Sequence, residues 1–347
     1  MSDRWFATFP AGFGPLVLRL AARDLPGCSA RPDGDNALRL EREASKSGDT
    51  APRALLAYCR GLFRVISEAP GGLDRASRSI ARDPRVGPAI AGGRARAGAT
   101  FVLRSFGPED PASLPREARS SLEELIARRT GARPYSERPE REFRLQERAD
   151  GTVLFLERIG AQGDAGSRPE PRRGELPRQT CRLLAEMTEP RADDVFLDPF
   201  CGYGGIALER ALAAPYRFVF ASDADPDKVA AVKAALAARA FERRRKTIFP
   251  KTRDALDSSA FEPGFVTAIA TDPPWGQFEG GPGAAPAAEL LRGFLNEAAR
   301  LLAPGGRLVL LVARGADQEI GPCFVQRERL DVLVSGKKAK ALRWDRI

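Results

Sequence analysis

Apolar strands alternate with helices from residue 195 toward the C-terminus, and this rhythm restricts the fold more than any other feature of the 347-residue chain. Strands are expected at residues 195–197, 216–221, 265–270 and 307–312, and helices at 206–213, 226–240 and 287–302. Successive strand–helix units of this length form a parallel, doubly wound sheet with helices on both faces. Residues 327–334 and 339–344 are expected to close the sheet as an antiparallel hairpin. This half is therefore α/β.

The preceding half has a different pattern, which predicts an α+β region. Strands are expected at residues 5–9, 61–67 and 100–106, and helices at 14–25 and 111–130. Asp150-Gly151 lies between two apolar-patterned runs and predicts a hairpin over residues 143–156. Residues 160–174 (GAQGDAGSRPEPRRG) are rich in Gly, Pro and charge, which is typical of a linker. We therefore expect an N-terminal region at 1–160, a linker at 161–174 and a C-terminal domain at 175–347.

The chain contains no histidine, which narrows its possible chemistry. Without imidazole there is no Ser–His–Asp or Cys–His nucleophile system and no His-containing zinc or iron site. Lys and Arg outnumber Asp and Glu by 55 to 46, giving a net charge of +9. A basic balance favours polyanionic partners such as nucleic acid, although a solvated surface explains scattered arginines equally well.

The cysteine pattern and the apolar runs indicate a cytoplasmic protein. Five cysteines are present and none is spaced C-x-x-C, which argues against both a disulfide framework and a metal site. No apolar run approaches the ~20 residues of a membrane span. The N-terminal residues lack a basic stretch ahead of an apolar segment, so no signal peptide is expected.

The segment Asp198-Pro-Phe-Cys-Gly-Tyr-Gly-Gly follows the first strand of the C-terminal half. In a doubly wound fold, ligands bind outside the carboxyl ends of the strands, where the strand order reverses. Gly202 and Gly204 permit unusual backbone angles and close approach to a ligand. A G-x-G alone is also compatible with a tight structural turn, because the longer dinucleotide fingerprint is missing.

Three acids further along the chain extend this candidate site. Asp223 ends the second strand, 19 positions after Gly204, where such folds hold ribose hydroxyls. Asp225 precedes Pro226 and is interpreted as a helix N-cap. Asp254, in Arg-Asp-Ala, can accept a hydrogen bond from an adenine amino group or can be an ordinary loop acid.

Asp272-Pro273-Pro274-Trp275 directly follows the third strand and carries the most specific signal. Two prolines hold the backbone rigidly and leave carbonyl groups without neighbouring N–H groups. The acid and a carbonyl can accept both hydrogens of a planar amino group, while the indole ring stacks on the heterocycle. A rigid turn at the end of a strand is the alternative interpretation, which the three preceding motifs make less attractive.

The order D-P-F-C-G-x-G, strand-end acid, R-D-A and D-P-P-W resembles class I S-adenosylmethionine-dependent amino-methyltransferases, which have a Rossmann-like fold. The whole chain is similar to the THUMP-domain RNA methyltransferases, which modify the exocyclic N2 of guanine in tRNA. The resemblance implies a ferredoxin-like and THUMP-like N-terminal region that binds RNA. Two positions depart from the family pattern: Tyr203 and Gly205 stand where Ser and Thr are usual, and Glu175-Leu176-Pro177 lacks the usual His.

The resemblance implies S-adenosyl-L-methionine as the cofactor, bound by residues of the first three motifs: Asp198, Pro199, Phe200, Cys201, Gly202, Gly204, Asp223, Ala224, Asp254 and Ala255. It also implies that Asp272, Pro273, Pro274 and Trp275 are catalytic, and no metal is required. Two clusters of basic residues are candidates for RNA phosphate contacts: Arg82, Arg85, Arg94 and Arg96, and Arg243, Arg244, Arg245 and Lys246.

The leading interpretation is a monomeric, cytoplasmic methyltransferase acting on tRNA or another structured RNA, with guanine N2 as the target. The same chemistry on ribosomal RNA or DNA is an alternative, and the N-terminal half favours RNA. A non-catalytic RNA-binding protein with a degenerate methyltransferase fold is a further alternative, against which the intact acids argue.

Overall fold

The structure is a computed structural model and describes residues 2–43, 51–90, 99–107, 111–135, 137, 139–160, 172, 174–257, 259–276, 284–314 and 320–347. The chain forms two compact units. The first comprises Met1–Phe9 and Leu18–Ser167, and the second comprises Pro10–Val17 and Arg168–Ile347. Most of the expected linker, residues 161–171 and 173, lies outside the described residues.

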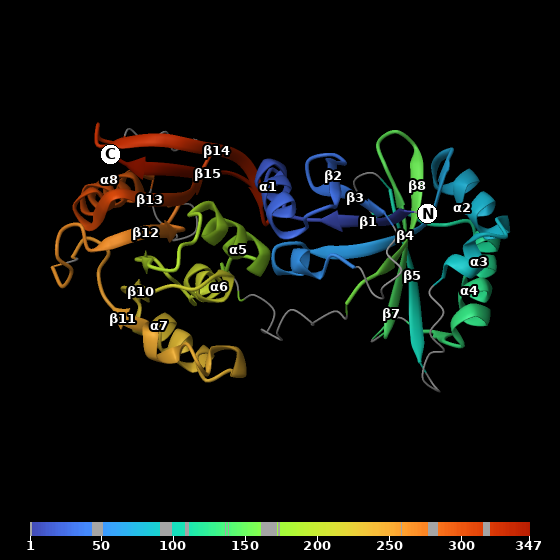
Figure 1. The fold of residues 1–347 in the computed structure, drawn as a ribbon, viewed down its shortest axis with the longest axis horizontal. Coiled ribbons are helices and arrows are strands. Elements are labelled where there is room, and N and C mark those ends of the chain that lie inside the picture. Colours follow the sequence, from blue (N-terminus) through green and yellow to red (C-terminus); the bar gives the residue numbers. More distant parts are fainter. Residues whose placement is uncertain are drawn as a thin grey trace. The chain divides into compact units, whose positions relative to one another are not determined.

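The first unit is built on an eight-stranded sheet with the order β2-β3-β1-β4-β8-β7-β5-β6 (Figure 1). β5 runs parallel to β6 and β7, and the remaining pairs are antiparallel. Its strands are β1 (Ser2–Thr8), β2 (Ser29–Pro32), β3 (Ala37–Glu43), β4 (Gly61–Pro70), β5 (Thr100–Phe106), β6 (Arg133–Pro134), β7 (Arg141–Glu147) and β8 (Thr152–Arg158). The helices in this half of the chain are α1 (Gly14–Asp24), η1 (Arg53–Ala57), α2 (Gly72–Arg82), α3 (Val86–Ala89) and α4 (Arg116–Thr130).

The main core of the first unit lies between α2, α3, α4 and one face of the sheet. Leu122 and Ile126 of α4 pack there with Phe101, Phe143 and Phe155 of the strands. The expected hairpin is confirmed, since β7 pairs with β8 and the Gly151 N–H donates to the Arg148 carbonyl in the turn. α2 and β3 were not predicted, because arginines and serines dilute the apolar pattern of these segments.

The second unit contains a seven-stranded sheet with the order β11-β10-β9-β12-β13-β15-β14 (Figure 1). The first five strands are parallel and the last two are antiparallel, as expected for a doubly wound sheet closed by a hairpin. The strands are β9 (Val195–Asp198), β10 (Phe218–Asp223), β11 (Ile248–Thr252), β12 (Val266–Thr271), β13 (Leu302–Ala313), β14 (Phe324–Val334) and β15 (Lys337–Arg346). The helices are α5 (Arg178–Met187), α6 (Gly205–Ala213), α7 (Pro226–Ala235), η2 (Arg239–Phe241), η3 (Arg245–Thr247) and α8 (Ala284–Leu301).

The predicted α/β class is confirmed, and the differences lie in individual elements. α7 ends five residues earlier than predicted and is followed by two 3₁₀ turns. The edge strand β11 and the helix α5 were not predicted. β11 carries a proline and a lysine, and only one of its five residues is buried, so its sequence gives a weak strand signal.

Helices cover both faces of this sheet. Phe294 of α8 packs in a core with Leu197 of β9 and Ile269 of β12. The neighbouring residue Phe196 points to the opposite face, where the Arg210 guanidinium of α6 lies 6.0 Å from its ring centroid. The chain order reverses at β9, because β10 lies on one side of it and β12 on the other. Among the described residues, no helix is both long and apolar enough to cross a membrane.

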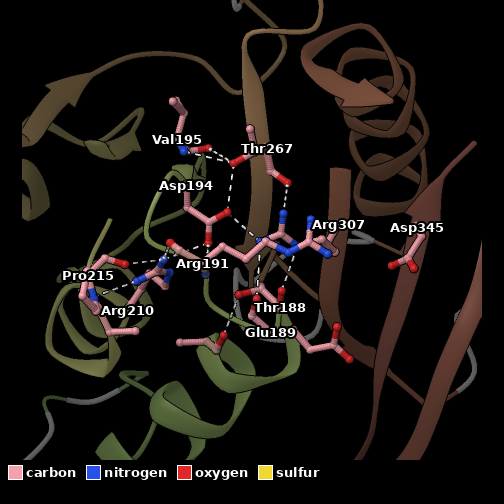
Figure 2. A network of polar contacts seen from close by, with 12 residues as sticks. Thr188, Glu189, Arg191, Asp194, Val195, Arg210, Pro215, Thr267, Arg307 and Asp345 are labelled. Atoms are coloured by element: carbon pink, nitrogen blue, oxygen red, sulfur yellow. Dashed lines mark hydrogen bonds and ion pairs between the residues drawn. The ribbon is translucent and has the colours of Figure 1, made fainter. Parts of the chain in front are cut away.

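A buried ionic network joins the amino-terminal ends of β9, β12 and β13 (Figure 2). Asp194, which precedes β9, accepts from Arg210 Nη2 at 2.8 Å and from Arg307 Nη2 at 2.6 Å. Its Oδ1 also accepts from Thr267 Oγ1 at 3.0 Å. Arg307 donates further to the Thr188 carbonyl at the end of α5 (2.9 Å). One carboxylate therefore lies at the centre of a network that includes three strands and two helices. Although burial acts to raise the pKa of Asp194, hydrogen bonds from the Arg191 N–H and from Arg210, together with the charge of Arg307, keep it below its usual range.

We expect Asp194→Ala to destabilise the second unit by about 3–5 kcal/mol, because it leaves two buried guanidinium groups without their carboxylate. Urea unfolding followed by tryptophan fluorescence in a Trp5→Phe background measures this, since only Trp275 and Trp344 of the second unit then report. Arg327→Ala, which removes an exposed ion pair with Asp345, is the control and should cost less than about 1 kcal/mol. Equal effects of the two variants would contradict the prediction.

Candidate functional site

The glycine-containing loop after β9 is held by its own backbone and by β10. The Gly204 N–H donates to the Cys201 carbonyl (2.7 Å), and the Cys201 N–H donates to the Ser222 carbonyl (2.9 Å). Gly204 has φ +83°, and a Cβ there would lie 2.9 Å from Val232 of α7, so only glycine fits. Gly202 has φ +52° and open space where a Cβ would be. The loop therefore presents accessible backbone at the point where the strand order reverses.

Asp223, at the end of β10, fastens this loop. Its Oδ2 accepts from the Gly202 N–H at 2.8 Å, and its Oδ1 accepts from the Asp225 N–H at 3.0 Å. Lys228 Nζ lies 3.8 Å from Oδ1. The interpretation of Asp225 as N-cap of α7 is confirmed, because its side chain accepts from the Asp227 N–H. Asp223 thus lies at the predicted position, with a structural contact that the sequence did not reveal.

Asp198 is a buried carboxyl group at the end of β9, and only 1% of its surface is exposed. Its Oδ1 accepts from Thr271 Oγ1 at 2.7 Å. Its Oδ2 is buried and has no hydrogen-bond partner among the described residues. Burial, together with the nearby charges of Asp272 and Asp223, raises the pKa of Asp198 to about 8. An unpartnered buried oxygen is costly and indicates a position prepared for a donor or a cation.

Asp272 follows β12 directly and lies close enough to Asp198 to influence its ionisation. The indole Nε1–H of Trp275 donates to Asp272 Oδ1 at 2.9 Å. Burial raises the pKa of Asp272 to about 7, and the bond from Trp275 acts in the opposite direction. In the same motif Pro273 is buried and Pro274 is exposed. The two carboxyl groups that flank the strand-order reversal therefore both have raised pKa values.

The remaining predicted cofactor residues have different surroundings. Asp254 is exposed and its Oδ1 accepts from the Leu256 N–H at 2.9 Å, which is a local turn contact. The Arg253 N–H donates to the Asp223 carbonyl, so this turn begins beside the end of β10. Ala255 is buried in the core, Ala224 is exposed, and the Phe200 ring packs edge-on against Phe294. Asp254 therefore has the least direct structural support in the predicted set.

The two basic clusters lie in different units. Arg82 and Arg85 line a hollow of about 600 Å³ on the first unit, together with Arg75, Arg78, Ser79 and Asp83. Arg94 and Arg96 lie outside the described residues. The second cluster is exposed between α7 and β11 and comprises Arg243, Arg244, Arg245 and Lys246.

Both departures from the family pattern have local partners. A Cβ at Gly205 would lie 2.6 Å from the Cys181 sulfur, so glycine allows α6 to approach α5 closely. The guanidinium of Arg172 lies 4.5 Å from the Tyr203 ring centroid, a cation–π contact at the edge of the glycine loop. The Cys181 thiol also donates weakly to the Leu176 carbonyl, in the segment that lacks histidine.

Thr271 is the functional residue that sequence reasoning missed. Its hydroxyl bonds to Asp198 and also accepts from the Phe200 N–H at 3.3 Å, so it joins β12 to the glycine loop. The available signal was a polar residue directly before Asp272 at the end of an apolar strand. The set as a whole offers three carboxyl groups and an unpartnered buried oxygen beside open backbone. This donor set fits a ligand with positive charge and hydroxyl groups, as S-adenosylmethionine has.

Residues 166–319, less than half of the chain, match the protein family described as RMKL-like, methyltransferase domain. A tRNA (guanine(10)-N2)-dimethyltransferase of Methanothermobacter thermautotrophicus is 30% identical over 173 residues. That match covers 49% of this chain and 48% of the relative, so the chain matches about half the length of this curated relative.

Solved structures extend the likeness to the whole chain. TrmN from Thermus thermophilus superimposes with a TM-score of 0.77 at 23% identity, covering 99% of this chain and 100% of that one. A predicted N6-adenine-specific DNA methylase from Listeria monocytogenes gives a TM-score of 0.67 at 14% identity, covering 99% and 96%. At these identities, the two neighbours establish the fold alone. The second unit therefore has a Rossmann-like fold, and most of its length matches a methyltransferase domain model.

We expect Asp198→Asn to stabilise the ligand-free protein by about 2 kcal/mol or more at pH 8, because the amide carries no charge to bury and each pKa unit corresponds to about 1.4 kcal/mol. The folded pKa near 8 exceeds the usual carboxyl value, so the folded state binds more protons between about pH 4 and 8. Wild type therefore loses stability as pH rises through this window, and the advantage of Asp198→Asn shrinks toward pH 4. Thermal unfolding at several pH values in the Trp5→Phe background measures the difference in stability between Asp198→Asn and wild type. Asp193→Asn, a substitution of an exposed acid, is the control. An Asp198→Asn protein less stable than wild type at pH 8 would refute this expectation.

Proposed function

We propose that this protein transfers a methyl group from S-adenosylmethionine to an exocyclic amino group of RNA. The observation that carries the proposal is the junction between the glycine loop and the Asp-Pro-Pro-Trp motif. Thr271 bonds to Asp198 at the strand-order reversal, and the next residue is Asp272. A site for the cofactor and an acceptor for an amino group are thus adjacent. The match of residues 166–319 to a methyltransferase domain supports the same chemistry.

The cofactor contributions of the chain follow from its donors and charges. Asp198 offers its unpartnered oxygen to a positively charged group of the cofactor, and Asp223 offers a carboxylate to the ribose hydroxyls. Gly202 and Gly204 let the backbone approach closely. When bound, S-adenosylmethionine supplies an activated methyl group, so no protein nucleophile is required.

The substrate contributions belong to the motif after β12. Asp272 and the Pro273 carbonyl accept the two amino hydrogens, which concentrates the nitrogen lone pair toward the methyl group. Asp272 then takes the proton that the nitrogen releases, a role suited to a carboxyl group with a pKa of about 7. Trp275 stacks on the base, offsetting part of an unstacking cost of a few kcal/mol. Histidine has no place in this mechanism.

Guanine N2 in tRNA is the substrate that we propose. The curated relative is named for this reaction, and the net charge of +9 favours a polyanion. We further propose that the first unit is a ferredoxin-like and THUMP-like RNA-binding region. The candidate phosphate contacts are the hollow lined by Arg82 and Arg85 on this unit and the exposed run Arg243–Lys246 on the second unit.

Methyl mapping on RNA tests the proposal directly. Purified protein is incubated with labelled S-adenosylmethionine and unmodified host tRNA, host ribosomal RNA or DNA, and new methyl groups are located by nuclease digestion and mass spectrometry. N2-methylguanine in tRNA is the expected product. Methylation of DNA or ribosomal RNA without tRNA would refute the substrate, and a protein that neither binds the cofactor nor methylates any of the three would refute the activity.

We expect Asp272→Asn to lower kcat about a hundredfold or more while the cofactor Kd changes less than about threefold. The amide keeps the size of the side chain and cannot accept the proton from the substrate nitrogen. Single-turnover kinetics and titration calorimetry separate the two quantities. Asp257→Asn, an exposed acid that bonds only within its own turn, is the control. Turnover near the wild-type value would remove Asp272 from the mechanism.

A further inference from the structure

Asp198 and Asp272 share one arrangement: each carboxyl group gives one oxygen to a donor inside the site. Asp198 Oδ1 accepts from the Thr271 hydroxyl, and Asp272 Oδ1 accepts from the Trp275 indole N–H. Among the described residues, the second oxygen of Asp198 is buried and has no hydrogen-bond partner, and the indole bond to Asp272 uses Oδ1 rather than Oδ2. A carboxyl group held at one oxygen cannot rotate freely, so the direction of its other oxygen is set.

Thr271 is placed to orient Asp198 and not merely to fill space. Its side chain is fully buried, and its hydroxyl both donates to Asp198 Oδ1 and accepts from the Phe200 N–H. The distance to the carboxyl oxygen is 2.7 Å, which is the usual length of a hydroxyl–carboxylate bond. Valine has nearly the same shape as threonine and would pack equally well. The hydroxyl therefore serves the carboxyl group rather than the core.

Trp275 supplies a ring N–H donor that phenylalanine lacks. Its Nε1–H lies 2.9 Å from Asp272 Oδ1, three residues earlier in the same rigid motif. Phenylalanine offers the ring without a donor, so stacking and hydrogen bonding can be separated by one substitution. The bond favours the charged carboxylate and counteracts the effect of burial on the pKa of Asp272.

We infer that Thr271 and Trp275 are paired positioning residues: Thr271 aims the unpartnered oxygen of Asp198 at the cofactor, and Trp275, by holding Oδ1, aims Oδ2 of Asp272 at the substrate amino group. The inference rests on the proposed methyltransferase function. It assigns separate roles to the two donors, one in cofactor binding and one in the chemical step. A purely structural role for either residue would affect both quantities together.

Thr271 is tested by its effect on cofactor affinity. We expect Thr271→Val to raise the Kd for S-adenosylmethionine about tenfold, because a hydrogen bond to a charged group is lost. Thr271→Ser retains the hydroxyl and should stay within about threefold of wild type. Titration calorimetry measures the Kd, and thermal unfolding checks that each variant is folded. If Thr271→Val does not fold, Thr271→Ala replaces it against the same serine control.

Trp275 is tested by the pH dependence of the chemical step. We expect Trp275→Phe to leave the cofactor Kd within about threefold and to lower kcat about tenfold or more. The charged and titratable groups of this site are Asp198, which the charge of Asp272 reaches, and Asp223, whose charge reaches Asp198. Cys201 lies within reach of Asp198 and Asp223, and Lys228 pairs with Asp223. These groups are unchanged in the variant. Loss of the indole donor raises the pKa of Asp272, so the acid limb of the kcat profile should move to higher pH.

The outcomes separate this inference from the proposed function. If wild type binds the cofactor and methylates RNA, but Thr271→Val and Thr271→Ser have equal Kd values for the cofactor, the positioning role of Thr271 is overturned. If kcat falls in Trp275→Phe but the acid limb of the kcat–pH profile does not move, the role of Trp275 as a hydrogen-bond donor is overturned and only stacking remains. Wild type that shows neither binding nor methylation overturns the proposed function itself, together with the positioning roles that rest on it.

Discussion

The contact of Asp194 with two buried arginines fixes the frame on which the candidate site is built. Arg307 on β13 and Arg210 on α6 meet one carboxylate at the amino-terminal end of β9, and Thr267 brings in β12. Asp198 and Thr271 are the last residues of β9 and β12. The network at the amino-terminal ends of these strands therefore helps to fix how far apart Asp198 and Thr271 lie at the carboxyl ends. Buried charges tolerate little displacement, because losing a partner costs several kcal/mol. Such a rigid frame suits the candidate site, because Asp198 and the Thr271 hydroxyl are joined by a single hydrogen bond that depends on the distance between the two strands.

The candidate site itself is electrostatically incomplete. Burial raises the pKa values of both Asp198 and Asp272, and the charges of Asp272 and Asp223 raise that of Asp198 further, while Asp223 itself accepts from backbone N–H groups and lies beside Lys228. The folded protein thus holds two carboxyl groups that would gain stability from a positive charge. A sulfonium cofactor with an ammonium group carries such charge, and its binding would favour the ionised acids that amino-group chemistry needs. The lack of histidine fits this arrangement, since the titration near neutral pH comes from carboxyl groups moved upward by burial.

Local patterns in the sequence predicted most of the sheet, and long-range contacts explain what they missed. The parallel strands, the closing hairpin, the Asp150-Gly151 turn and the Asp225 N-cap each depend on neighbouring residues, and all are confirmed. Arg210 and Arg307 could only be noticed as charged residues within apolar segments, because their partner Asp194 is 16 and 113 positions away. Thr271 reads as the last residue of an apolar strand until Asp198, 73 positions earlier, is placed beside it. The bond from Trp275 to Asp272 spans only three positions, and its geometry depends on how the two prolines turn the chain.

Tyr203 and Gly205, which stand where Ser and Thr are usual in the family that the sequence resembles, make different local contacts and leave the glycine loop undistorted. Gly205 leaves room for the Cys181 sulfur, which allows α5 and α6 to pack closely. Tyr203 projects from the loop toward the Arg172 guanidinium, a contact that serine could not make. Neither change disturbs the bonds that shape the loop, which run from Gly204 to Cys201 and from Gly202 to Asp223. Because the backbone geometry rests on these glycines and on Asp223, the side chain at position 203 can vary without altering the loop, whereas a side chain at position 205 would require the Cys181 sulfur to move. The segment without histidine also has local contacts, since the Leu176 carbonyl accepts from the Cys181 thiol and Pro177 is the N-cap residue of α5.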